Sequence, residues 1–111
     1  MKITEKDVIA INQKFDDGTI VNRGSFDFAL ASIRKSQDWQ EQIAYLLRAL
    51  LVDHIFKDGN KRTATYLLID ALERGSFKFN QEELGILTVK IAKGNINDIK
   101  EIKKLIAGVI Y

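Results

Sequence analysis

Residues 43–68, IAYLLRALLVDHIFKDGNKRTATYLL, contain an apolar segment, a polar break and a second segment with apolar residues at helical spacing. In the first segment, residues at offsets of 3, 4, 7, 8 and 11 share one face of an α-helix: Ile43, Leu46, Leu47, Leu50, Leu51 and His54. Asp58-Gly59-Asn60 favours a reversal of the chain. A second helix is predicted from about Asn60 to Arg74, with Gly75 at its C-terminal end. The stretch therefore predicts two helices joined by a polar loop.

Helix-forming patterns also cover most of the remaining sequence. The helix that contains Ile43 is predicted to begin near Asp38. Four further helices are predicted: one after Thr4, one after Ser25, one over residues 81–93 and one over residues 97–111. Residues 15–24 carry two glycines and a short β-prone trio, which predicts a loop or a small hairpin. No proline, repeat or linker interrupts the chain. We therefore expect one all-α domain over residues 1–111, a bundle of about six helices.

Composition and charge exclude several classes of protein. The 111 residues include no cysteine, which excludes disulfides and cysteine nucleophiles. The start of the chain has no apolar signal region, and no apolar run approaches the roughly 18 residues of a membrane span. We therefore expect a cytoplasmic protein without a membrane segment. The net charge of +2, from 17 basic and 15 acidic residues, is too small to indicate a nucleic-acid partner.

The polar break carries groups that suit phosphate chemistry. His54 is the only histidine, and a lone histidine on an apolar helix face is more often a core residue than a catalytic one. The residues after it favour catalysis. A glycine turn that opens a helix exposes unpaired N–H groups, and Lys61 and Arg62 add two cations that the helix dipole disfavours unless an anion binds. Asp58 suits Mg²⁺, which proteins hold through one or two carboxylates and substrate phosphates. These groups indicate transfer of a phosphorus group from a nucleotide to a hydroxyl.

The segment His54-Ile55-Phe56-Lys57-Asp58-Gly59-Asn60-Lys61-Arg62 resembles the signature of the Fic/Doc family, His-Pro-Phe-x-Asp/Glu-Gly-Asn-Gly/Lys-Arg. Only Ile55 departs from the signature, at a position where many members have proline. The likeness extends over nearly the whole chain, and Leu84–Gly94 is similar to a helix of the short Doc branch. The resemblance implies the family's all-α bundle, which is also the fold that the apolar pattern predicts.

The resemblance implies a role for each polar residue of the loop. These roles are a general base at His54, a Mg²⁺ carboxylate at Asp58, an anion-binding turn at Gly59 and Asn60, and contacts to the phosphates of ATP from Lys61 and Arg62. Phe56 would anchor the loop in the core. Asn22 and Arg23 would lie on a flap beside the target peptide, which makes them candidate docking residues.

Two positions bear on the reaction that the resemblance implies. Lys61 stands where most adenylylating members have glycine, and Thr65 stands where their longer motif has arginine. Lysine at the first position is typical of Doc toxins, in which ATP binds in the reverse sense and offers its γ-phosphate. Gly59 mildly favours the other branch, since some Doc toxins have alanine there.

The favoured expectation is thus a toxin that transfers the γ-phosphate of ATP to a protein hydroxyl, with a translation factor such as elongation factor Tu as an example of the target. One alternative is a Fic-type adenylyltransferase that uses the same residues. Another is an inactive member that binds nucleotide or a partner. The family's inhibitory pattern, Ser/Thr-x-x-x-Glu-Gly/Asn, is absent from the sequence, and in Ser36–Glu41 the glutamate comes one place too late. The resemblance therefore implies restraint by a separate antitoxin.

Overall fold

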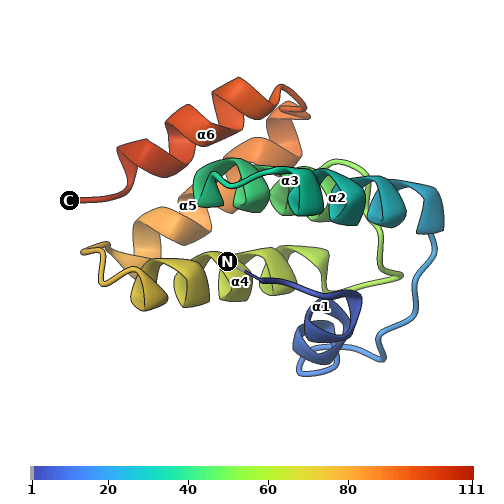
Figure 1. Cartoon of the computed structure of the whole chain (residues 1–111). Helices are drawn as coiled ribbons and strands as arrows, with labels where there is room; N and C mark the ends of the chain where they lie inside the picture. Colours follow the sequence, from blue (N-terminus) through green and yellow to red (C-terminus); the bar gives the residue numbers. More distant parts are fainter. Residues whose placement is uncertain (1) are drawn as a thin grey trace.

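The computed structural model describes residues 2–111, and these fold into six α-helices (Figure 1). The helices are α1 (Glu5–Asn12), α2 (Arg23–Lys35), α3 (Trp39–Leu51), α4 (Asn60–Arg74), α5 (Gln81–Gly94) and α6 (Ile99–Gly108). Within the described residues, β-pairing is limited to two isolated bridges, Ile20 with Phe56 and Phe79 with Ile110. The all-α bundle predicted from the apolar pattern is confirmed. Among residues 2–111, no helix has the length and apolar character needed to cross a bilayer.

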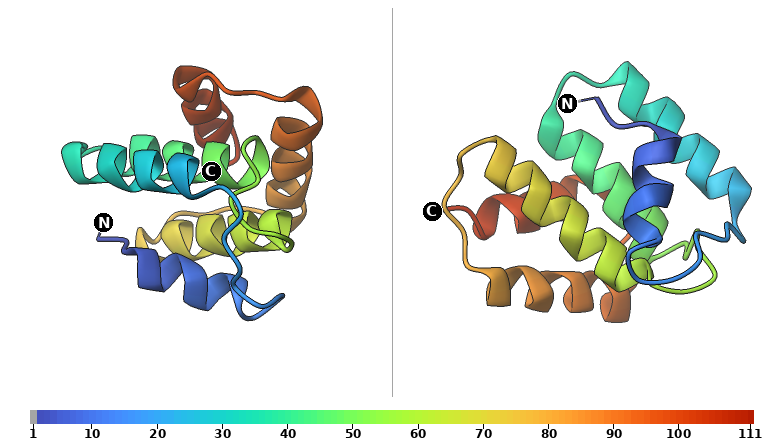
Figure 2. Two further views of the ribbon diagram at one scale, coloured as in Figure 1. Left: turned by 90° about the vertical axis from the view of Figure 1, so that its right-hand side faces the viewer. Right: turned by 90° about the horizontal axis from the view of Figure 1, so that it is seen from below.

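Helix α3 lies at the centre of the bundle and packs against α2, α4, α5 and α6. Figure 2 shows α1 on the far side of α4, away from α3, and α1 packs against α4. Five of the residues predicted on the apolar face of α3 are fully buried: Ile43, Leu46, Leu47, Leu50 and Leu51. Burial of this continuous stripe is the main driving force for association of the surrounding helices.

Helix caps explain where most of the elements begin. Five of the six described helices start after a polar residue whose side chain accepts a backbone N–H of the first turn: Thr4, Asn22, Asp38, Asn80 and Asp98. At Thr4 the bond is reciprocal, because Asp7 also accepts from the Thr4 N–H. Helix α4 is the exception, since its N-cap is Gly59 and no side chain caps it. Its first N–H groups are therefore left for other partners.

Three predicted boundaries differ from the structure. The second helix starts at Arg23 with Asn22 as its cap, so the predicted cap at Ser25 is wrong. Asn22 is the cap and not Ser25, because Asn22 Oδ1 accepts from Ser25 N while Asn22 Nδ2 donates to Asp53 O. The second bond joins the start of α2 to the segment that follows α3. The last helix occupies Ile99–Gly108 only, because Asp98 caps it and Ile110 pairs with Phe79 instead of continuing the helix.

The third difference concerns the end of α3. The helix stops at Leu51, three residues before the predicted end at His54. The backbone N–H of Ile55 donates to Ala49 O at 3.2 Å, and the Ile55 side chain is fully buried. The chain therefore leaves the helical path so that Ile55 and Phe56 can enter the core.

Candidate active site

His54 lies in the connection between α3 and α4 and has a left-handed backbone conformation, with φ of +52°. Its side chain is exposed. The interpretation as a buried core histidine is thus excluded, and His54 lies beyond the end of α3 and not on its apolar face. Within the described residues, neither ring nitrogen takes part in a hydrogen bond with the protein. The imidazole is therefore accessible to a group that binds in front of it.

The two residues after His54 fix this connection to the core. Ile55 and Phe56 are buried, and the ring of Phe56 packs 6.0 Å from that of Phe26. The segment 19–22 runs alongside, because Val21 N and Asn22 N donate to Ile55 O and Lys57 N donates to Thr19 O. The predicted anchoring role of Phe56 is consistent with this burial. A loop or a small hairpin was predicted for residues 15–24. The structure has a loop that ends at Asn22, since residues 23 and 24 belong to α2, and this loop pairs with the His54 loop and not with itself.

The turn from Asp58 to Asn60 is closed by its own polar groups. Asp58 Oδ1 accepts from Gly59 N at 2.7 Å. Asn60 Oδ1 accepts from Phe56 N at 3.1 Å, and Asn60 Nδ2 donates to Phe56 O at 2.9 Å. In this structure the Asn60 side chain holds the loop in shape, so its contact with phosphate oxygens stays a prediction.

Gly59 is required at this turn for two reasons. Its φ of +75° is a conformation that L side chains rarely adopt. A Cβ at this position would also lie 3.1 Å from Asn12 Nδ2. The predicted turn residue therefore allows both the reversal of the chain and a close approach by α1.

Asn12 is a residue of the site that the sequence did not indicate. Its side chain is fully buried at the end of α1. Asn12 Nδ2 donates to Asp58 O at 3.0 Å and to Thr63 Oγ1 at 3.1 Å, while its Oδ1 accepts from Gly18 N at 3.0 Å. One amide thus joins α1, the following loop, the Asp58 turn and the first turn of α4.

The predicted phosphate-binding residues line a common cleft with His54. The cleft has a volume of about 420 Å³ and is lined by Phe15, His54, Lys57, Asp58, Gly59, Asn60, Lys61, Arg62 and Ala92. Three of these residues are exposed cations: Lys57, Lys61 and Arg62. The four ion pairs found within residues 2–111 involve none of them. Lys57 was not predicted to contribute, although its place in the polar loop was a signal. The cleft thus combines unpaired cations with the uncapped start of α4, an arrangement that attracts anions.

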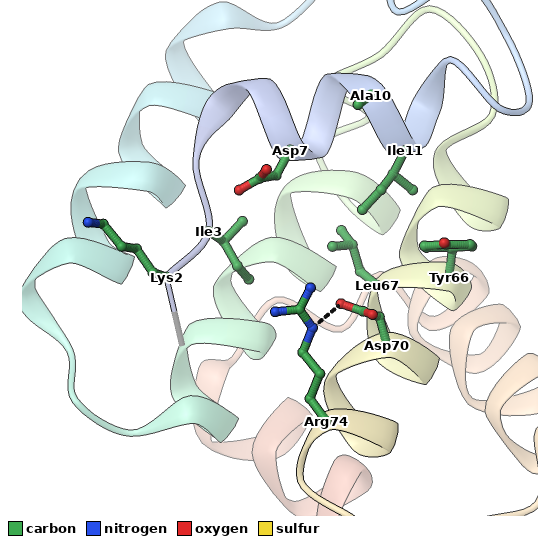
Figure 3. A pocket seen from close by; sticks show the side chains of 9 residues that line it. All are labelled: Lys2, Ile3, Asp7, Ala10, Ile11, Tyr66, Leu67, Asp70 and Arg74. Atoms are coloured by element: carbon green, nitrogen blue, oxygen red, sulfur yellow. Dashed lines mark ion pairs between the residues drawn. The ribbon is translucent and has the colours of Figure 1, made fainter.

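A second hollow of similar volume, about 420 Å³, lies between the N-terminal segment, α1 and α4 (Figure 3). Arg74 Nε pairs there with Asp70 Oδ2 at 3.0 Å, so its charge is already balanced. Hydrogen bonds from Thr4 hold the pKa of the Asp7 carboxyl below its ordinary value, which keeps a further negative charge at this hollow. Because two carboxylates line it, this hollow is less suited to a polyphosphate than the His54 cleft.

The flap residues Asn22 and Arg23 are both engaged within the protein. Asn22 caps α2 and donates to Asp53 O, as described above. Arg23 Nη1 pairs with Glu5 Oε1 at 2.6 Å and with Asp27 Oδ1 at 3.2 Å, and the hydrogen bond to Glu5 raises the pKa of the guanidinium. Neither residue lines the cleft. A role of either in docking a target therefore stays a prediction.

The donors in the cleft fit a magnesium ion bound together with a nucleotide. Among residues 2–111, Asp58 is the only carboxylate that lines it, and one of its oxygens accepts from Gly59 N. Among the described residues, no group of three or more histidine, cysteine, aspartate or glutamate side chains could hold a metal alone. Mg²⁺ commonly binds one or two carboxylates and takes its other ligands from substrate phosphates and water. The single carboxylate beside an anion-binding loop matches that pattern.

Comparison with known protein families identifies the class to which this fold and cleft correspond. The profile of the Fic/DOC family matches residues 2–72, which include α1, α2, α3, the His54 loop and nearly all of α4. The chain therefore belongs to the Fic/DOC family. Proteins of this family generally transfer nucleotidyl or phosphate groups to proteins, typically from ATP with Mg²⁺. A comparison with curated protein sequences gives no significant match.

Proposed function

We propose that this protein is a Doc-like kinase, which transfers the γ-phosphate of ATP to a hydroxyl side chain of a target protein. The observation that carries the proposal is the start of α4, where Lys61 is exposed and makes no ion pair among the described residues, and where Thr65, one turn further on, stands at the position of the arginine of adenylylating members. Thr65 Oγ1 donates to Lys61 O one turn back in the helix, at 2.9 Å, and a threonine side chain offers no positive charge. The cations that a triphosphate can reach are therefore concentrated at the His54 end of α4.

In the proposed reaction, His54 accepts the proton of the target hydroxyl as its oxygen attacks the γ-phosphorus. A bond forms between that oxygen and phosphorus, the bond from phosphorus to the β–γ bridging oxygen breaks, and ADP leaves with the electron pair. Lys61, Arg62 and the N–H groups at the start of α4 hold the phosphate oxygens in line with the attacking oxygen. A Mg²⁺ ion bound at Asp58 would neutralise charge on the phosphates.

The proposal extends to the biological setting. The protein would act in the cytoplasm as a toxin on a translation factor such as elongation factor Tu, and a separate antitoxin would restrain it. Its chain carries no inhibitory pattern of the family within residues 1–111, which supports restraint in trans. A Fic-type adenylyltransferase is the second candidate, favoured by Gly59, which several Doc toxins replace by alanine. The third candidate is an inactive family member, whose cleft binds nucleotide or a partner without catalysis.

We expect label from γ-labelled ATP, and none from α-labelled ATP, to appear on the target protein. The bulk and charge of Lys61 should seat the triphosphate so that the γ-phosphorus lies in line with the hydroxyl that His54 activates. The two labels would be compared by incubation with purified elongation factor Tu and, in parallel, with a cell lysate. Mass spectrometry of the modified protein should show the addition of one phosphate. Incorporation of the α-label would refute the kinase and favour the adenylyltransferase.

Lys61→Gly is the matched variant for this experiment. It should lower γ-label incorporation because it removes the charge that positions the triphosphate. It should not give efficient adenylylation, since Thr65 remains in place of a cation.

We expect Asp58→Ala to lose the effect of Mg²⁺ on ATP binding. The carboxylate is the only one in the cleft, so its removal leaves the ion no protein ligand of its usual kind. Asp58→Asn is the isosteric variant, in which an amide oxygen can still accept from Gly59 N while the negative charge is lost, and we expect it to lose the effect of Mg²⁺ as well. Calorimetric titrations with ATP, with and without Mg²⁺, would measure the effect. If either variant binds ATP as the wild type does and responds to Mg²⁺ equally, Asp58 is not the metal ligand.

A further inference from the structure

A groove between α4 and α5 continues the His54 cleft along α4. Its volume is about 430 Å³. Phe15, Lys61 and Arg62 line both the cleft and the groove, so the two are adjacent. The remaining lining residues of the groove are mostly apolar or small: Thr65, Tyr66, Ile69, Gly85, Thr88 and Val89. The combined depression has His54 and the polar loop at one end and an apolar surface at the other.

The groove offers aromatic and apolar contact but few free hydrogen-bonding groups. Phe15 and Tyr66 meet edge to face, with ring centroids 6.3 Å apart, and Tyr66 is 39% exposed. The two threonine hydroxyls in the groove are engaged within the protein, because Thr65 Oγ1 donates to Lys61 O and Thr88 Oγ1 donates to Gly85 O, which leaves the hydroxyl of Tyr66 as the free one among the described residues. A flat ring would therefore find mainly apolar contact surface here, with few specific polar partners.

Gly85 keeps this groove open. It lies inside α5, where glycine is a poor helix former, and its backbone conformation does not require glycine. A Cβ at this position would meet no atom within 4 Å, so packing does not require glycine either. The effect of Gly85 is to leave a space in the wall of the groove that any side chain would occupy.

We infer that the groove between α4 and α5 binds the base of the nucleotide through apolar contact and does not discriminate between purines. This inference rests on the proposed function, since it assigns the phosphates to the adjoining cleft. With the base in the groove, the polyphosphate crosses Lys61 and Arg62 at the junction and its terminal phosphate approaches His54. That is the sense of binding that γ-phosphate transfer requires. The cleft and the groove are each of a volume typical of small-molecule sites, which range over about 300–1,000 Å³.

The test compares three ligands and variants of two glycines. Gly85→Leu fills the groove, and Gly108→Leu is its matched control, because Gly108 is also helical and open but lies at the end of α6. Binding of Mg²⁺-ATP and of inorganic tripolyphosphate would be measured by calorimetry. We expect Gly85→Leu to weaken ATP binding by about tenfold or more, since a lost stacking contact has an effect of this order, and to leave tripolyphosphate binding within about twofold. Gly108→Leu should change neither, and wild-type protein should bind ATP and GTP within about threefold of each other.

Each other outcome has a defined meaning. Unchanged ATP affinity in Gly85→Leu would place the base elsewhere and overturn the inference, while the proposed function would stand. Equal weakening of ATP and tripolyphosphate would also overturn it, because the leucine would then act on the phosphate cleft. A strong preference for ATP over GTP would contradict the unselective contact. If the wild-type protein binds neither ATP nor tripolyphosphate, the proposed function itself is refuted. Thermal unfolding would reveal whether the leucine variant is misfolded. Gly85→Ala introduces a smaller side chain, should give an intermediate loss of ATP affinity, and serves as the test if the leucine variant does not fold.

Discussion

His54→Ala should abolish phosphate transfer and leave binding of Mg²⁺-ATP close to the wild-type value. His54 is exposed at the cleft that Lys61 and Arg62 also line, so its ring is accessible to a target hydroxyl beside the phosphates. A positioned general base contributes on the order of 10² to 10⁴ in rate. Single-turnover transfer of labelled phosphate and calorimetric ATP binding would separate the loss of chemistry from a loss of binding.

Two further variants make this result specific to the imidazole. His54 has a φ of +52°, a conformation that asparagine tolerates better than most residues, so His54→Asn removes the base with the least strain on the loop. Asp53→Asn is the control, because Asp53 precedes His54 and is engaged through its backbone alone, which accepts from Asn22 and donates to Arg48. We expect His54→Asn to be as inactive as the alanine variant and Asp53→Asn to remain active. More than about a tenth of wild-type activity in either His54 variant would refute its role as the base.

Periodicity and capping predicted the interior of the helices better than their ends. The spacing of the leucines identified the buried face of α3, and Asn60 to Arg74 coincides with α4. The end of α3 was not predictable from spacing, because the residue at offset 11 still falls on the apolar face. What ends the helix is the burial of Ile55 and Phe56, which depends on a core built by other helices. The same holds at Asn22 and Ser25, which are both good caps, and a bond to Asp53 decides between them.

Most of the polar residues of the cleft could be predicted because they are close together in the sequence. His54, Asp58, Gly59, Lys61 and Arg62 lie within nine positions of the sequence, and the structure brings all five to one cleft. The groove beyond the cleft was not predictable in this way, since it forms only where α5 packs against α4. Contacts between distant segments leave no periodic or spacing signal in the sequence.

Asn12 is the clearest case of such a contact, and its substitution is expected to have a large effect on stability. We expect Asn12→Ala to lower the free energy of unfolding by about 2–4 kcal/mol. The residue is fully buried, and its removal leaves Asp58 O and Gly18 N without their partner. Three hydrogen bonds are lost, each with a net value of about 0.5–1.5 kcal/mol, and the partly buried Asp58 O and Gly18 N regain only part of this from water. Urea denaturation followed by circular dichroism would measure the change.

Asn12→Ala should also weaken binding of Mg²⁺-ATP although the residue does not line the cleft. Its Nδ2 holds the Asp58 carbonyl and contacts Thr63 in the first turn of α4, so its loss frees the turn that positions Asp58 and the start of that helix. Asn97→Ala is the matched control, since Asn97 is exposed and only its backbone oxygen accepts a bond, from Arg48. Binding would be measured where both variants are fully folded, so that lost affinity reports the loop and not unfolding. If Asn12→Ala binds ATP as tightly as Asn97→Ala under those conditions, the amide supports the fold alone, and the Asp58 turn keeps its shape through Asn60 and Gly59.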